Sequence, residues 1–299
     1  MRIFLTGATG YVGSAVLDAL IKAGHQVTGL ARDARKAKKL EKSGAAPVVG
    51  QIGQPETWID AARGHDAFVH AALDKAPRTA ASDKAAIEAI IALARQGGDQ
   101  TPVLYTSSIW VIGPTLHSAD ETTPLNPIAI SAWRASHEQI VLEAAGIRPI
   151  VVRPGLVFGG DRGYYGDLFK DGTNGLVRVI GEGRNRRPAV YGRDLADLYV
   201  RLLTRPDASG IYHATDEADE SVLDVVEALS RNTTHKPDVR FVPIEEARTK
   251  MGVLADALAL DQVVRSPRAH AIGWTPALKS IAGNIPRLLE EWRRGKSGD

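Results

Sequence analysis

Apolar segments of two kinds alternate along the first half of the chain. Arg2–Thr6 and Gln26–Ala31 are short, apolar and rich in strand-forming residues, so each predicts a buried strand. Between them, apolar residues recur at helical spacing from Val12 to Leu20, and Gly24 is a typical helix end. Further strands are predicted at 48–51, 67–72 and 103–105, with a short helix at 56–62. This alternation predicts an α/β fold, a doubly wound parallel sheet with helices on both faces.

Three glycines lie where the first strand turns into the first helix. Gly7 permits a tight turn, Gly10 lets the backbone approach a pyrophosphate, and Gly13 lets the helix pack closely on the strand. The helix N-terminus adds free N–H groups and the positive end of its dipole. With a second strand following in order, this pattern predicts a dinucleotide site. The alternative is a glycine turn that holds no ligand.

The end of the second strand indicates which dinucleotide is bound. An NAD site has an acidic residue there, about 20 residues after the glycines, which accepts a hydrogen bond from the ribose 2′-hydroxyl. This chain has Arg32, followed by Arg35 and Lys36. A guanidinium fits a 2′-phosphate, so we expect NADP(H). A shift of one residue would place Asp33 at the position and favour NAD instead.

The balanced charge and the absence of cysteine argue against several classes of function for this protein. The 299 residues carry 37 Lys and Arg against 35 Asp and Glu, a net charge of +2, which does not indicate nucleic acid or a membrane surface as partner. The absence of cysteine excludes disulfides, Cys-ligated zinc and thiol catalysis. No metal-binding motif, signal peptide or membrane-spanning apolar run is recognisable. We expect a cytoplasmic protein that binds a small molecule and no metal.

Motifs spread along the chain occur in the order and spacing of a known family. The motif segments are 6–13, 66–72, 106–108, 121–127, 153–159 and 273–292. Together they resemble the short-chain dehydrogenase/reductases, in the extended branch called the NAD(P)-dependent epimerase/dehydratase family. The resemblance implies a Rossmann-type fold. With the arginines above, it implies cofactor contacts from Gly7, Thr9, Gly10, Tyr11, Val12, Gly13, Arg32, Arg35, Gln51, Ile52, Ala71, Ala72, Thr106, His137, Pro154 and Val157.

The same resemblance implies two interleaved domains. A helix predicted at 193–204 and a strand predicted at 210–214 are expected to return to the first domain, as in relatives. We therefore expect an NADP-binding domain over 1–158, to which 190–215 returns. A smaller mixed α/β substrate domain would combine 159–189 with 216–299, including helices at 221–231 and 244–251. Relatives often dimerise through two helices, which correspond here to 87–95 and 131–145. A homodimer is therefore one alternative for this protein.

The chain departs from the family at the catalytic pair. Members carry a Tyr four residues before a Lys on one helix face, and the matching stretch here has Trp133 and His137. Because an indole N–H does not titrate usefully, Trp133 cannot act as a general acid, although it could stack on nicotinamide or substrate. His137 could bind the ribose or transfer a proton itself. The alternatives are core packing for Trp133 and a structural role for His137.

Other side chains are then needed near the substrate. Ser108 matches the family's catalytic serine, and Tyr165 is a candidate acid on a glycine-flanked loop at 163–166 that we expect to cover the site. Arg187 matches an arginine that binds a nucleotide-sugar diphosphate, unless it is an ordinary charged loop residue. The catalytic candidates are Ser108, Trp133, His137 and Tyr165, and the substrate contacts are expected from Ser108, Trp110, Trp133, Tyr164, Tyr165, Arg187 and Tyr191.

Three functions fit these features. The leading hypothesis is an NADP(H)-dependent oxidoreductase that transfers hydride to or from a small carbonyl, enone or imine with an altered proton relay. The second is a nucleotide-sugar epimerase or dehydratase, which Arg187 favours and the missing tyrosine disfavours. The third is an NADP(H)-binding sensor or scaffold without turnover, suggested by the loss of both members of the pair.

Overall fold

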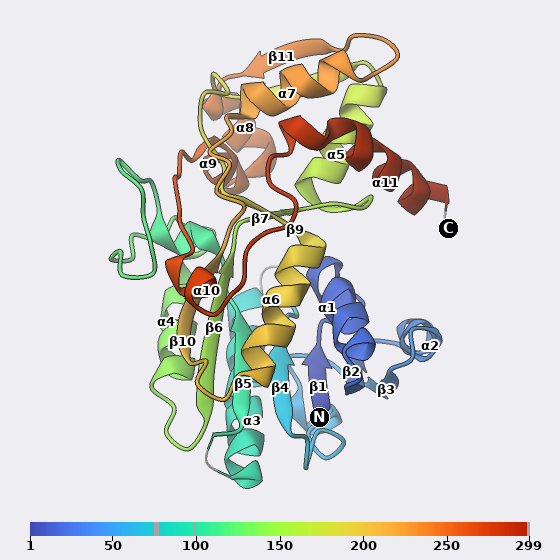
Figure 1. Ribbon diagram of the computed structural model, residues 1–299, viewed down its shortest axis with the longest axis vertical. Helices are drawn as coiled ribbons and strands as arrows, with labels where there is room; N and C mark the ends of the chain where they lie inside the picture. Colours follow the sequence, from blue (N-terminus) through green and yellow to red (C-terminus); the bar gives the residue numbers. More distant parts are fainter. Residues whose placement is uncertain (75–77, 99, 298–299) are drawn as a thin grey trace.

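Strands from residues 2–214 form a seven-stranded parallel sheet (Figure 1). We describe a computed structural model, which covers residues 1–74, 78–98 and 100–297. The strand order is β10-β6-β5-β4-β1-β2-β3, and all neighbours pair in parallel. The strands are β1 (Arg2–Thr6), β2 (Gln26–Ala31), β3 (Ala46–Val49), β4 (Ala67–His70), β5 (Pro102–Thr106), β6 (Arg148–Pro154) and β10 (Gly210–Ala214). The doubly wound α/β sheet predicted from the alternation of segments is confirmed.

Helices cover both faces of this sheet, because the side chains of each strand alternate between them. Along β1, Ile3 and Leu5 join a core with α1 (Tyr11–Lys22) and α6 (Gly192–Thr204). Phe4 joins the opposite core with α3 (Thr79–Ala94) and α4 (Ala132–Leu142). α2 (Ala34–Lys42) packs on β2 and β3 near one edge, and α10 (Pro267–Ala271) packs on β10 at the other. Because all seven strands are parallel, their carboxyl ends lie at the same edge of the sheet, between the two helical layers.

A smaller group of elements lies beyond that edge, above the strand ends in Figure 1. Its helices are α5 (Gly163–Thr173), α7 (Val222–Arg231), α8 (Ile244–Met251), α9 (Leu254–Ala259) and α11 (Ile285–Ser297). Two short parallel pairs complete it: β8 (Leu176–Ile180) with β11 (Asp238–Val242), and β7 (Leu156–Phe158) with β9 (Ala189–Tyr191). Short 3-10 turns lie at η1 (Pro55–Thr57), η2 (Arg95–Gly97), η3 (Ile109–Ile112) and η4 (Ala282–Asn284). None of the helices in the described residues is long and apolar enough to cross a membrane.

Two predicted elements are wrong. In place of the helix expected at 56–62, the structure has only the 3-10 turn η1 followed by further turns. The Thr57 hydroxyl donates a hydrogen bond to the Gln54 carbonyl, which competes with helical bonds of the backbone. The Trp58 side chain is buried in the core, where it stacks on Phe4. Residues 163–166, expected to form a loop, are the first turn of α5. Gly166 serves packing there, since a Cβ on it would lie 2.6 Å from the Asp161 carbonyl oxygen.

Candidate active site

The glycine turn between β1 and α1 brings three backbone segments into close contact. Gly7 has a positive φ of 74°, and a Cβ on it would lie 2.4 Å from the Ala71 carbonyl oxygen after β4. A Cβ on Gly13 would lie 2.1 Å from the Gly7 carbonyl oxygen. Only glycine fits at either position. The first N–H groups of α1 have no partners within the helix, so this turn fits a pyrophosphate.

The other predicted cofactor residues lie beside this turn or at neighbouring strand ends. Thr9, Gly10, Tyr11 and Val12 open α1; Gln51 and Ile52 follow β3; Ala71 and Ala72 follow β4; Thr106 and Pro154 end β5 and β6, and Val157 lies in β7. Several of these side chains have partners of their own. The Tyr11 hydroxyl donates to the Gly159 carbonyl at 2.6 Å, and the Thr106 and Tyr199 hydroxyls lie 2.7 Å apart. Contacts from Tyr11 or Thr106 to a cofactor are therefore expected from the backbone.

Positive side chains gather at the start of α2, and we call them the cation cluster: Arg32, Arg35, Lys36, Lys39 and Arg162. Burial and then the charges of Arg35, Lys39, Arg162 and Arg32 lower the pKa of Lys36. Arg162 arrives from the segment before α5 and lies 5.7 Å from the centre of the Tyr11 ring. Within the part of the chain that the structure describes, none of the five forms a salt bridge. The cluster therefore suits an anion.

Asp33, the competing residue for a ribose hydroxyl, has a structural task. One oxygen of its carboxylate accepts the Lys36 backbone N–H at 2.8 Å and caps α2. The Gln51 side-chain amide donates to the Arg32 carbonyl at 3.1 Å, which holds the ends of β2 and β3 together. The arginine side chain of Arg32 stays exposed. This geometry favours Arg32 over Asp33 as the cofactor-facing side chain.

Trp133 and His137 lie one turn apart on α4 and contact each other edge to face, with ring centres 5.0 Å apart. The indole Nε1 donates to the Ile130 carbonyl at 3.1 Å. The Arg134 guanidinium lies 4.3 Å from the indole centre and donates to the Tyr105 hydroxyl and the Thr106 carbonyl. Trp133 is therefore held as a partly exposed wall beside His137.

His137 belongs to a buried hydrogen-bonded network centred on Asp83 of α3. His137 Nδ1 lies 2.7 Å from Asp83 Oδ2, and the Tyr105 hydroxyl donates to the same oxygen at 3.0 Å. Asp83 Oδ1 lies 3.0 Å from His70 Nε2, and His70 Nδ1 lies 2.7 Å from the Thr6 hydroxyl. Asp83, His70 and His137 are only 3%, 2% and 5% exposed. The network links α4 through α3 to the ends of β4 and β1.

The carboxyl of Asp83 is ionised in this setting. Burial alone would raise its pKa, but the facing His70 and the hydrogen bonds from His137 and His70 lower the pKa well below its usual value. Arg134 acts in the same direction. An ionised carboxylate offers acceptors only, so each imidazole nitrogen that faces it carries a hydrogen.

Ser108 follows β5 and caps η3, where its Oγ accepts the Trp110 N–H at 3.3 Å. The neighbouring Ser107 has a different task, because its hydroxyl donates to Glu138, which forms a buried ion pair with Arg153. The Ser108 hydroxyl is partly exposed and keeps its own hydrogen for another acceptor. This is the geometry expected of a hydrogen-bond donor to a substrate oxygen.

A cavity of about 540 Å³ is lined by Trp110, which follows Ser108 by two residues in the sequence, but not by Ser108 itself. We call it the α5–α8 cavity. Its apolar lining includes Trp110, Leu156, Tyr164, Ile180, Met251 and Leu258, and its charged lining mixes signs: Arg178, Arg240 and Lys250 with Asp167, Asp171 and Glu246. Two predicted substrate residues, Trp110 and Tyr164, thus share one cavity.

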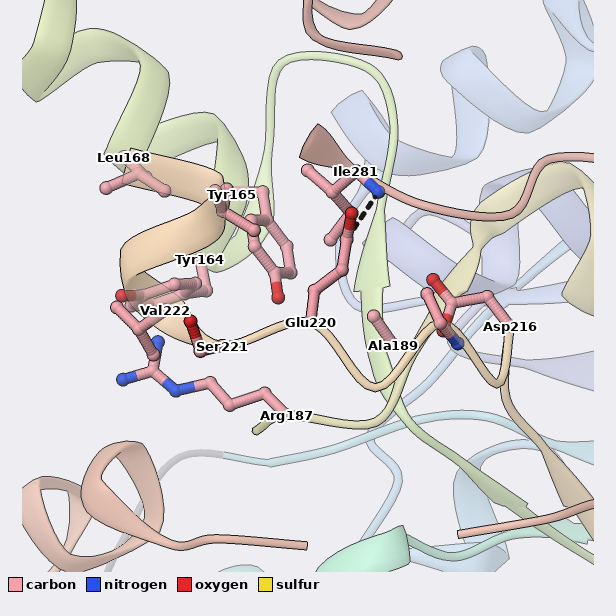
Figure 2. Close-up of a pocket in the computed structure, with 12 residues that line it drawn as sticks. Tyr164, Tyr165, Leu168, Arg187, Ala189, Asp216, Glu220, Ser221, Val222 and Ile281 are labelled. Carbon is pink, nitrogen blue, oxygen red and sulfur yellow. Dashed lines mark hydrogen bonds between the residues drawn. The ribbon is translucent and has the colours of Figure 1, made fainter. Parts of the chain in front are cut away.

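The structure corrects the expectation for Tyr165 and Arg187, which line a hollow of only about 10 Å³ (Figure 2). Tyr165 is 4% exposed, packs on Phe158, and has a pKa raised far above its usual value by burial, so it is no candidate acid. In Figure 2 the Arg187 guanidinium lies beside the Tyr164 ring. The guanidinium carbon is 4.7 Å from the centre of that ring. Arg187 also donates to the Leu258 carbonyl. The hollow has room for one water molecule and none for a diphosphate.

Tyr191 also lies apart from the α5–α8 cavity. Its hydroxyl donates to Glu291 of α11 at 2.8 Å, and its ring packs against Phe158. It lines a separate hollow between α1, α6 and α11, together with Tyr11. The predicted substrate residues are thus divided between different places in the fold.

Sequence reasoning missed the partners of His137. Asp83 stands on the apolar face of α3, four residues before Ile87 and seven before Ile90, both buried. A charged residue at that spacing is a signal that something satisfies it. Arg162 was missed because it is distant in sequence from the turn that it approaches.

Comparisons with known proteins show the family of this chain. A model of the NAD dependent epimerase/dehydratase family matches residues 3–215. The uncharacterized protein C2A9.02 of Schizosaccharomyces pombe is 29% identical over 95% of this chain and 98% of its own. The 4-hydroxy-2-methyl-3-oxo-4-farnesyl-3,4-dihydroquinoline-1-oxide ketoreductase of Stigmatella aurantiaca is 30% identical, covering 83% of this chain and 78% of its own.

A solved structure of a human epimerase family protein with NADPH has the same fold, with a TM-score of 0.81 at 19% identity, over 97% of this chain and 99% of that one. The match over most of the chain and the relative at 30% identity support a nicotinamide dinucleotide cofactor and an oxidoreductase type of enzyme. The chain belongs to the NAD dependent epimerase/dehydratase family.

Proposed function

We propose that the protein is an NADP(H)-dependent oxidoreductase that transfers hydride to or from an apolar carbonyl, enone or imine compound. The observation that carries this proposal is the cation cluster beside the glycine turn. A 2′-phosphate would neutralise charges that now repel each other, whereas the 2′-hydroxyl of NAD would not. Asp33, the one acid near Arg32 in sequence, is engaged as the cap of α2.

Each part of the site has a task in such a reaction. The bound cofactor supplies or accepts the hydride. The N–H groups at the start of α1 bind its pyrophosphate, and Arg32 and Arg35 bind its 2′-phosphate. Ser108 donates a hydrogen bond to the substrate oxygen and Trp133 forms a wall of the site, while His137 takes the place that the family gives to lysine. The α5–α8 cavity holds the rest of the substrate and excludes water from it.

The substrate class follows from the cavity lining. Burial of an alkyl chain or ring against Trp110, Leu156 and Met251 would stabilise the complex by roughly 25 cal/mol per Å² of apolar area. The ketoreductase relative is named for a substrate that carries a farnesyl chain, which agrees with an apolar compound here. A nucleotide sugar is disfavoured, because Arg187 lies in a hollow too small for its diphosphate.

Binding and turnover together test this proposal. NADPH should bind at least tenfold more tightly than NADH, measured by quenching of tryptophan fluorescence. Arg32→Ser should weaken NADPH binding about 10- to 100-fold, the effect of losing a charge-assisted hydrogen bond, and leave NADH binding nearly unchanged. Arg63→Ser, an exposed arginine far from the turn, is the matched control. Equal affinity for the two cofactors would contradict the NADP assignment.

Turnover is measured as NADPH oxidation with ketones, aldehydes, enones and imines of increasing alkyl length. We expect kcat/KM to rise with length for at least one class. Tight NADPH binding without oxidation by any of them would favour the sensor. Conversion of a nucleotide sugar without net NADPH consumption would favour the epimerase.

A further inference from the structure

We propose that Asp83 positions His137 as the group that exchanges a proton with the substrate oxygen, and that His70 shares this carboxylate and limits its effect. The inference rests on the proposed function, because it assigns the proton half of that reaction. It concerns residues of α3, α4 and β4 that come together only in the folded chain.

The contacts fix the tautomer of His137. Its Nδ1 faces the ionised Asp83 carboxylate at 2.7 Å and therefore carries a hydrogen. Its Nε2 has no hydrogen-bond partner among the described residues, and neutral His137 presents a lone pair there. Protonation adds a hydrogen at Nε2 and pairs the imidazolium with Asp83. The same nitrogen is thus an acceptor in one state and a donor in the other, as a general acid–base group requires.

His70 competes for the same carboxylate. Its Nε2 carries the hydrogen that faces Asp83 Oδ1, and its Nδ1 lies 2.7 Å from the Thr6 hydroxyl, whose hydrogen it accepts when the ring is neutral. The hydrogen bond from His70 withdraws negative charge from the Asp83 carboxylate. A positive charge on His70 would also repel a positive charge on His137. Among the described residues, the titratable and charged groups gathered around the Asp83 carboxylate are His137, His70, the Tyr105 hydroxyl and Arg134. Asp83 favours the imidazolium, whereas Arg134 and His70 oppose it.

A hydride from the cofactor and a proton from His137, which water replaces, are sufficient for the reaction. In reduction of a ketone, the carbonyl carbon gains the hydride and the oxygen gains the proton from His137 Nε2. The N–H bond breaks as the O–H bond forms, and His137 is left neutral until it takes a proton from water. In the direction of oxidation, neutral His137 accepts the hydroxyl proton at the same nitrogen. Trp133, which cannot supply a proton, is the wall against which the imidazole edge is held.

Nuclear magnetic resonance of ¹⁵N-labelled imidazoles tests the inference without any turnover. In the free protein we expect neutral His137 to carry its hydrogen on Nδ1. Asp83→Asn should lower the pKa of His137 by at least one unit, a tenfold change in proton affinity. His70→Phe, which keeps a ring against Tyr105, should raise it. Glu88→Gln, an exposed acid on the same helix, should change neither. A His137 titration that Asp83→Asn leaves unchanged would overturn the proposal.

Kinetics with NADPH and a reducible ketone supply the second arm. His137→Gln, whose amide keeps a hydrogen-bonding group toward the cofactor ribose but cannot transfer a proton, should lower kcat about 100-fold or more. Asp83→Asn should move the pH profile of kcat downward by the shift seen in the titration, and a profile that stays in place would refute the positioning role. If no compound is reduced but the titrations behave as expected, the proposed function fails and the assignment of Asp83 as the group that positions His137 stands.

Discussion

Replacing Gly13 by alanine should disrupt the turn on which cofactor binding depends. The added Cβ would lie 2.1 Å from the Gly7 carbonyl oxygen and 3.1 Å from the Ala8 nitrogen. Cβ atoms essentially never approach closer than 3.0 Å, so α1 and the turn must separate by roughly another ångström. Both partners are backbone, so no side-chain rotation can relieve the clash.

The expected loss follows from that displacement. Overpacking of a closely packed contact typically costs about 1–3 kcal/mol, and a clash with backbone on both sides belongs at the upper end. In a protein of 299 residues, whose entropy of unfolding is roughly 0.6 kcal/mol per kelvin, about 3 kcal/mol lowers the melting temperature by roughly 5 °C. The N–H groups that face the pyrophosphate move with α1, so NADPH binding should weaken at least tenfold.

Thermal unfolding, monitored by circular dichroism, measures the loss of stability. A fluorescence titration with NADPH measures the loss of affinity. Gly192→Ala is the matched control, because Gly192 opens α6 and its added Cβ would meet nothing closer than 3.6 Å. That variant should be neutral or more stable by up to about 1 kcal/mol. If Gly13→Ala melted with the unaltered protein and bound NADPH equally well, the assignment of this turn as a close-packed cofactor cradle would be refuted.

Three further predictions concern other sites. Arg153→Met should destabilise the protein by about 3–5 kcal/mol in urea unfolding, because it leaves Glu138 buried without its partner, and adding Glu138→Leu should recover most of the loss. Burial raises the pKa of Asp216 to about 7, so the folded state keeps a proton that the unfolded chain releases from about pH 4. The free energy of unfolding of Asp216→Asn, relative to that of the unaltered protein, should therefore rise between pH 4 and 7 and then level off. A difference in unfolding free energy that does not change with pH would contradict that pKa. Trp110→Ala should raise KM for a long-chain ketone while the NADPH dissociation constant stays the same, which steady-state kinetics and fluorescence titration distinguish.

The sheet could be predicted from sequence because its signals are local. β1, β2 and β10 have the predicted bounds, and α1 begins within one residue of Val12. The errors arose where local signals compete with tertiary contacts. The segment around Trp58 contains residues that favour a helix, but burial of the indole against Phe4 leaves only a short 3-10 turn before it. The glycines beside Tyr165 were interpreted as the flanks of a loop over the site, whereas Gly166 lies in α5 and permits a close contact with Asp161.

The candidate site was predictable only where its residues are adjacent in sequence. The glycine turn and Arg32 lie within one strand–helix–strand unit, so their proximity follows from chain connectivity. Asp83 and His137 are 54 positions apart, and nothing in their spacing shows that α3 and α4 pack side by side. Arg187 shows the reverse error, since its position in a family motif does not reveal that it lies in a hollow beside Tyr164.

The setting of Asp83 bears on whether the protein transforms a substrate or only binds its cofactor. An ionised carboxylate at 3% exposure carries a desolvation cost that a well-packed apolar residue would avoid. Tyr105 and His70 are buried, and a structural role would account for their bonds to Asp83. His137 is different, because one nitrogen is bound to the carboxylate while the other has no partner among the described residues. A sensor would need only the glycine turn and the cation cluster, whereas an imidazole held by a buried carboxylate through one nitrogen, with the other nitrogen unpaired among the described residues, favours proton transfer.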